Sequence, residues 1–179
     1  MYKLVNKFIA LLNILKHSIK LLYTPTPEYS YYEKGCSFNH LKKYNLSVYY
    51  LSNAIKHGFE NSQLYWRRGN NYEMLGNIEQ AIKDFTRAIE LDPDNSKLYY
   101  NRGKLLSEKG DEKNAEKDYK ENIKRDSTDP KPYTGLGYLY YTNGQIELAL
   151  ENYRKAIKND KRYIQYIPDE LLDKLNTDM

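Results

Sequence analysis

The sequence contains a single cysteine, Cys36, in 179 residues. One cysteine excludes a disulfide framework within the chain and fits a reducing compartment such as the cytoplasm. Histidine is nearly as scarce, with only His17, His40 and His57. Cys36 and His40 are four residues apart, but no third residue is evident to orient the imidazole, and the pair supplies too few ligands for a metal. The sequence therefore predicts no catalytic, cofactor or metal site, and an enzyme based on this pair is the least favoured interpretation.

The chain also lacks a strong excess of one charge. It has 28 basic and 24 acidic residues, which gives a formal net charge of +4 at pH 7, and the two signs are interspersed. Nucleic-acid-binding proteins usually carry a concentrated basic surface, so no nucleic-acid partner is predicted. Phosphate-binding glycine loops, nucleophile elbows and complete calcium loops are missing as well. Tyrosine, by contrast, is abundant, with 20 residues. Its ring packs between helices while its hydroxyl group remains available for contacts.

The main signal in the sequence is a period of 34 residues. Three series of residues recur at this spacing: Tyr31, Tyr65, Tyr99 and Tyr133; Gly35, Gly69, Gly103 and Gly137; and Gly76, Gly110 and Gly144. A constant period of this length predicts a stack of short helical hairpins. The glycines inside the helical patterns indicate close contact between paired helices, and the later glycines suit left-handed caps that end each first helix.

This pattern resembles the tetratricopeptide repeat family. The second and fourth units match the family pattern closely, and the second shows it in Tyr65, Gly69, Tyr72, Gly76, Ala81, Phe85, Ala88 and Pro93. The resemblance covers four units, over residues 28–61, 62–95, 96–129 and 130–163. The third unit has Asn122 and Ser127 where alanine and proline are usual, and the first has Lys42 at the turn glycine and Ser47 at a small position. The resemblance implies an all-α, right-handed α-solenoid of four helix-turn-helix repeats.

Two segments flank the four units. Residues 1–23 have an apolar helical stripe with lysines largely off it, and the prolines of 24–27 separate this amphipathic helix from the repeats. We interpret the segment as a helix that packs on the first unit. A membrane-surface contact through residues 1–22, an uncleaved signal or anchor, and self-association through this helix remain open. At the other end, residues 164–179 predict a helix, starting near Pro168, that caps the fourth unit.

The resemblance also implies a surface for binding. In this family the first helices of successive units line a concave groove that accepts an extended or helical peptide. The residues placed there are Tyr32, Gln63, Trp66, Arg67, Asn70, Lys97, Tyr100, Asn101, Lys104, Lys131, Tyr138 and Tyr141. This aromatic, cationic and amide lining favours a protein or peptide partner with apolar anchors and acidic character.

One branch of the family grips acidic chaperone tails with a five-residue carboxylate clamp. Asn70, Asn101 and Lys131 match the clamp, but Trp66 and Gly135 replace its first lysine and its arginine. Loss of the arginine removes the forked donor suited to a carboxylate, so this sequence does not favour a chaperone tail. We predict a non-enzymatic, cytoplasmic protein–protein interaction module that acts as a scaffold. The alternative is a membrane-associated assembly factor anchored by the N-terminal helix.

Overall fold

The computed structural model describes residues 26–176, and every regular element in this part of the chain is a helix. The helices form four helix-turn-helix pairs: α2 (Pro27–His40) with α3 (Tyr44–Lys56), α4 (Ser62–Met74) with α5 (Ile78–Leu91), α6 (Ser96–Glu108) with α7 (Glu112–Arg125), and α8 (Pro130–Thr142) with α9 (Ile146–Asn159). A 3-10 helix, η1 (Lys161–Tyr166), and α10 (Asp169–Asn176) follow. The all-α repeat fold predicted from the sequence is confirmed. The helix predicted over residues 1–23 lies outside the described residues.

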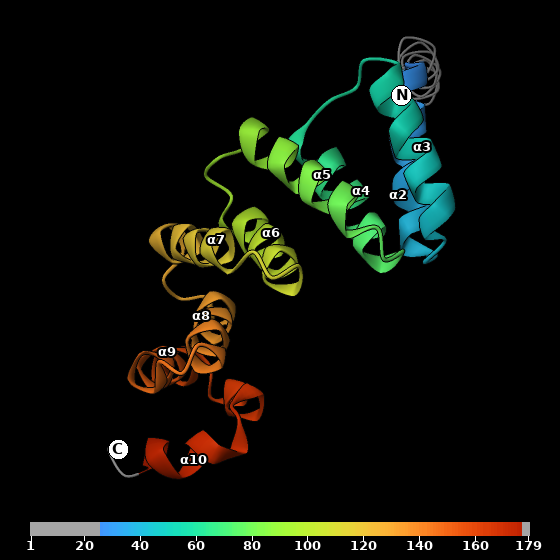
Figure 1. The fold of residues 1–179 in the computed structure, drawn as a ribbon. Helices are drawn as coiled ribbons and strands as arrows, with labels where there is room; N and C mark the ends of the chain where they lie inside the picture. The colour runs from blue at the N-terminus through green and yellow to red at the C-terminus, as the bar shows by residue number, and fades with distance from the viewer. Residues whose placement is uncertain (1–25, 177–179) are drawn as a thin grey trace, which may run out of the picture.

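The pairs stack in chain order into an elongated array, with the two ends of the described chain far apart (Figure 1). Each second helix contacts the first helix of the next pair: α3 contacts α4, α5 contacts α6, and α7 contacts α8. Some first helices also contact one another directly, α2 with α4 and α6 with α8. Helices on the inner side of a curved stack approach most closely, so the first helices form the concave side of the array.

Glycines inside the helices allow the two helices of a pair to touch. A Cβ atom added at Gly69 would lie 2.9 Å from the ring of Phe85, and one at Gly137 would lie 2.7 Å from the ring of Tyr153. Both rings are fully buried. Because a side chain at either glycine would displace a core ring, the recurring glycine is explained by packing rather than by backbone flexibility.

The turn between paired helices requires a left-handed residue. Gly76 ends α4 with a φ angle of +75°, a conformation that costs glycine nothing. In the first unit Lys42 occupies the equivalent position and adopts a φ angle of +55°. The first unit therefore keeps the turn of the repeat although it lacks the glycine, at a cost in backbone strain.

A buried ion pair fixes the second unit to the first. Arg68 of α4 donates from Nε and Nη2 to the two carboxylate oxygens of Asp84 on α5, with both distances 2.7 Å. Its Nη1 also donates to Ser52 Oγ on α3, at 3.0 Å. Asp84 is only 4% exposed. One guanidinium group thus joins both helices of its own pair to the second helix of the preceding pair.

The same arrangement recurs one period later, in the third unit. Arg102 of α6 donates from Nε at 2.8 Å and from Nη2 at 2.7 Å to the carboxylate of Asp118 on α7. Its Nη1 donates to Thr86 on α5, at 3.1 Å. In the fourth unit the corresponding residues are Leu136 and Asn152, so the described fourth unit has no such ion pair.

A second polar network occurs at the junction of the first two units. Asn39 Nδ2 donates to Asn71 Oδ1 at 2.5 Å, and Asn71 Nδ2 donates to Ser47 Oγ at 2.7 Å. The Ser47 hydroxyl group in turn donates to the carbonyl oxygen of Gly35, at 2.7 Å. Asn71 and Ser47 are fully buried. The serine that departs from the family pattern therefore has a specific partner.

The fourth unit is covered by the C-terminal segment. Ile167, Leu171 and Leu175 are buried against the apolar side of α9. The capping helix was predicted to start near Pro168, and α10 begins at Asp169, whereas the short helix η1 before it was not predicted. Helix η1 contacts α8 on the concave side of the array.

Candidate functional site

The N-terminal part of the concave side is a packed aromatic surface. The ring of Tyr32 lies 4.9 Å from the ring of Phe59, and Trp66 packs against two buried hydrophobic clusters, one around Leu64 and Leu98 and one around Phe85. The guanidinium group of Arg67 lies 5.7 Å from the Trp66 ring centroid. Burial raises the pKa of Tyr32. These predicted groove residues are half-buried, so only part of each side chain is available for contacts.

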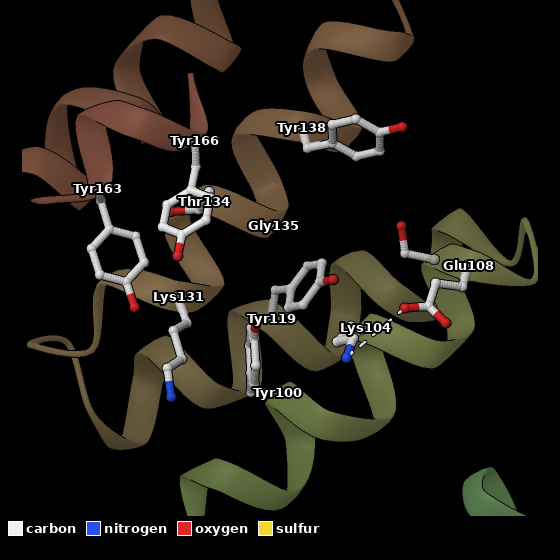
Figure 2. Close-up of a pocket in the computed structure, with 11 residues that line it drawn as sticks. Tyr100, Lys104, Glu108, Tyr119, Lys131, Thr134, Gly135, Tyr138, Tyr163 and Tyr166 are labelled. Carbon is white, nitrogen blue, oxygen red and sulfur yellow. Dashed lines mark ion pairs between the residues drawn. The ribbon is translucent and has the colours of Figure 1, made fainter. Parts of the chain in front are cut away.

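The C-terminal part of the concave side contains a pocket of about 450 Å³ between α6, α7, α8 and η1 (Figure 2). Its lining consists of Tyr100, Lys104, Ser107, Glu108, Tyr119, Lys131, Thr134, Gly135, Tyr138, Tyr163 and Tyr166. Four of these residues were predicted as groove residues, namely Tyr100, Lys104, Lys131 and Tyr138. The volume is in the range of sites that accept small molecules or single side chains.

One side of the pocket depends on Gly135. A Cβ atom at Gly135 would lie 2.5 Å from a carbon of the Tyr119 ring, so only glycine allows this ring to lie against α8. The rings of Tyr119 and Tyr100 are 6.0 Å apart. Burial raises the pKa of Tyr100 to about 12 and raises the pKa of Tyr119 as well. Both side chains are therefore neutral near pH 7, and their hydroxyl groups are hydrogen-bond donors.

The two lysines of the pocket differ in their surroundings. Lys104 Nζ lies 2.5 Å from Glu73 Oε1 and 4.0 Å from Glu108 Oε1, so its charge is already balanced. Lys131 Nζ lies 5.7 Å from the Tyr100 ring centroid. Within residues 26–176 it has no carboxylate oxygen within 4.0 Å. Lys131 is therefore the lysine of this pocket whose charge remains available to a partner.

The pocket is completed by two tyrosines that follow α9. Tyr163 and Tyr166 lie on η1 with their ring centroids 5.2 Å apart, and Figure 2 shows both rings extending from η1 toward the side where Lys131 lies. They were not among the predicted groove residues, because they lie outside the first helix of the last unit. Their spacing of three residues was the available signal, since residues three apart share one side of a 3-10 helix.

The other predicted groove residues lie outside the pocket. Gln63 and Lys97 are exposed, and the half-buried side chains of Asn70 and Asn101 make no hydrogen bond to any described residue. The Tyr141 hydroxyl group donates to Glu170 of α10. The concave surface therefore divides into the packed aromatic part, a polar middle and the tyrosine pocket.

The cysteine and histidine considered as a catalytic pair both lie on α2, whereas the tyrosine pocket is lined by α6, α7, α8 and η1. Cys36 is a half-buried free thiol, and His40 is an exposed residue at the end of α2. In residues 26–176 no three His, Cys, Asp or Glu side chains gather in a way that could hold a metal ion. None of the helices in that range has the length and apolar character needed to cross a bilayer.

Comparison with known proteins identifies the repeat. A family model for "TPR repeat" matches residues 69–110, and one for "Tetratricopeptide repeat" matches residues 96–129 and 130–163. No curated protein matches the chain in sequence.

Several solved structures share the fold. One is YrrB, described as "a TPR protein with an unusual peptide-binding site", with a TM-score of 0.74 and 20% identity over 89% of this chain and 85% of that chain. A second is MamA from Desulfovibrio magneticus RS-1, with a TM-score of 0.71 and 21% identity over 78% of each chain. A third is the Arabidopsis OM64 TPR domain, with a TM-score of 0.59 and 24% identity over 64% of this chain and 95% of that domain.

Proposed function

Because the chain belongs to the tetratricopeptide repeat family, we propose that it is a non-enzymatic protein–protein interaction module. On this proposal, a segment of a partner protein lies along the concave side formed by the first helices, and the chain acts by shape and polar complementarity. The single free cysteine supports a reducing compartment, and we infer that the protein acts in the cytoplasm.

The observation that carries this proposal is the tyrosine pocket on the concave side. It combines ring surfaces, hydroxyl donors and one lysine without a carboxylate partner among the described residues. Partly exposed tyrosines next to a cation are typical of surfaces where a few residues carry most of the binding energy. The fold shared with YrrB, which is described as having a peptide-binding site, supports the same class of partner.

The charges of the groove favour a partner segment with acidic character. Lys97 is exposed and stands one period before Lys131, so the two lysines recur at equivalent places of successive units. Lys104 contributes less to this preference, since it is held by Glu73. Long-range attraction of an acidic segment would raise the rate of association and would weaken as salt is added.

The proposal is tested by affinity capture from a lysate of the cells that produce the protein, with the full chain as bait. The groove variant combines Lys97→Glu, Lys131→Glu and Tyr138→Ala, all at exposed positions of first helices. Its control places the same changes on second helices, as Lys83→Glu, Lys117→Glu and Tyr49→Ala. Tyr138 and Tyr49 are 55% and 59% exposed, so the two variants match in charge and in accessible ring area.

A partner that binds the natural chain and the control variant but not the groove variant would support the proposal. A partner lost with the control and retained by the groove variant would move the binding surface to the convex side. Equal capture by all three proteins would refute a role for the concave side.

A further inference from the structure

The tyrosine pocket suggests which partner residue it accepts. We propose that it binds an aromatic residue at the C-terminus of the partner, with the ring in the pocket and the terminal carboxylate group beside it. This inference rests on the proposed function and specifies the partner's chemistry at one place in the groove.

The walls favour a flat aromatic ring. Tyr100 and Tyr119 form one side, with Gly135 removing the side chain that would otherwise project from α8. Tyr163 and Tyr166 form another side, on η1. Aromatic pairs prefer offset or edge-to-face contacts at centroid distances of about 4.5–7 Å. Because the pocket has tyrosine rings on two sides, an aromatic ring inside it can make an offset contact with one side and an edge-to-face contact with the other.

The pocket occurs at the junction of the third and fourth units because the residues there differ from their equivalents one period earlier. One period earlier, Asn101 stands where Gly135 stands in the fourth unit, and Lys104 stands where Tyr138 stands. The earlier junction therefore has a polar side chain in place of the glycine and a charge in place of a ring. In addition, η1 replaces the long first helix that a fifth unit would have provided.

The charges of the pocket favour a carboxylate beside that ring. Lys131 supplies a positive charge with no carboxylate within 4.0 Å among the described residues, and the Tyr163 and Tyr166 rings extend toward it (Figure 2). A doubly charged phosphate fits less well, because Lys104 is already paired and Glu108 adds a negative charge to the lining.

The test uses the full chain and small probes that separate ring from charge. N-acetyl-L-phenylalanine carries both groups, N-acetyl-L-phenylalanine amide carries only the ring, and acetate carries only the carboxylate. Binding is followed by two-dimensional amide NMR. We expect N-acetyl-L-phenylalanine to bind with a Kd on the order of 1 mM, with shifts centred on Gly135, Lys131 and η1. The amide should bind about tenfold more weakly, and acetate should not bind measurably in this range.

Variants show which residues bind the carboxylate group and which bind the aromatic ring. Lys131→Gln should remove the difference between the acid and the amide, whereas Lys97→Gln, the equivalent change one unit earlier, should preserve it. Tyr166→Ala should weaken both phenylalanine probes about two- to tenfold. Tyr166 is 58% exposed, so this change should leave the helical circular dichroism spectrum unaltered.

Three results would overturn the inference: equal binding of the acid and the amide, shifts that map outside the pocket, or a Lys131→Gln variant that still prefers the acid. If the capture experiment succeeds while these probes fail, the proposed function survives and only the pocket's specificity is wrong. If the groove variant captures partners as well as the natural chain but the probes bind as expected, the specificity of the pocket is supported and the proposed role of the whole groove is refuted.

Discussion

The Arg102–Asp118 ion pair gives a sharp test of how the third unit is held together. Replacing Arg102 by leucine removes two hydrogen bonds to Asp118 and one to Thr86. The Asp118 carboxylate, with the residue only 2% exposed, would then remain buried without its cation. Breaking a buried ion pair on one side typically costs about 3–5 kcal/mol. We therefore expect Arg102→Leu to lower the free energy of unfolding by about that amount.

The fourth unit indicates which second change should repair the defect. Leu136 and Asn152 stand one period after Arg102 and Asp118, and both are buried. Asn152 Nδ2 donates to the carbonyl oxygen of Leu148 at 2.8 Å, so this buried amide finds its hydrogen-bond partner within α9 and needs no cation from α8. The double variant Arg102→Leu with Asp118→Asn leaves no buried charge. It should unfold within about 1.5 kcal/mol of the natural chain.

The assay is urea unfolding of the full chain, followed by far-ultraviolet circular dichroism, for the natural chain, both single variants and the double variant. Arg87→Leu is the control, because its ion pairs with Glu60 and Glu90 lie at the surface, where its side chain is 44% exposed. That change should cost much less stability than Arg102→Leu, because solvent already screens the exposed ion pairs. A structural role for the buried ion pair is refuted if Arg102→Leu lowers the free energy of unfolding no more than Arg87→Leu does, or if the loss in the double variant equals the sum of the losses in the two single variants.

Three further predictions concern other positions. Gly137→Ala puts a methyl group 2.7 Å from the buried Tyr153 ring, so we expect a loss of about 1–3 kcal/mol in thermal melts; an unchanged midpoint would contradict close contact there. Lys42→Gly relieves a φ angle of +55°, so it should stabilise the chain by about 0.5–1 kcal/mol in urea unfolding, and a loss of stability would refute the strain. The pKa of Tyr100 is raised from 10.0 to about 12, so its contribution to stability is present below pH 10 and is lost as pH rises toward 12. Tyr100→Phe should flatten this alkaline dependence, and an unchanged slope would exclude the assignment.

Much of the fold could be predicted because its causes recur at one period. The glycine at position 69 and its equivalents reflect a helix contact that repeats in every unit, so the signal accumulates along the chain. The Arg68–Asp84 and Arg102–Asp118 ion pairs also recur, but in only two of the four described units, and they were not predicted from the sequence. The Asn39–Asn71 hydrogen bond could not be inferred at all, since it occurs once and joins residues of different units.

The candidate site was predictable only where it followed the repeat. Lys131 and Tyr138 were predicted groove residues, and both line the pocket, because the repeat period fixes where the first helices lie. Tyr119 belongs to a second helix and reaches the pocket only because Gly135 leaves room for it. Whether a lysine is available also depends on its neighbours, as the contact between Lys104 and Glu73 shows.

The polar contacts between the first two units affect how the hairpins pair with their correct neighbours during folding. Hairpins of similar sequence can pair with the wrong neighbour, within one chain or between two chains, and repeat proteins are prone to such misassembly. The Asn39–Asn71–Ser47 network can form only between the first and second hairpins, because later hairpins have leucine in place of Asn71, at Leu105 and Leu139. A hairpin docked in the wrong place would bury Asn71 without partners, and a buried amide without partners is costly. We therefore expect these few irregular residues to fix the sequence in which otherwise interchangeable units assemble.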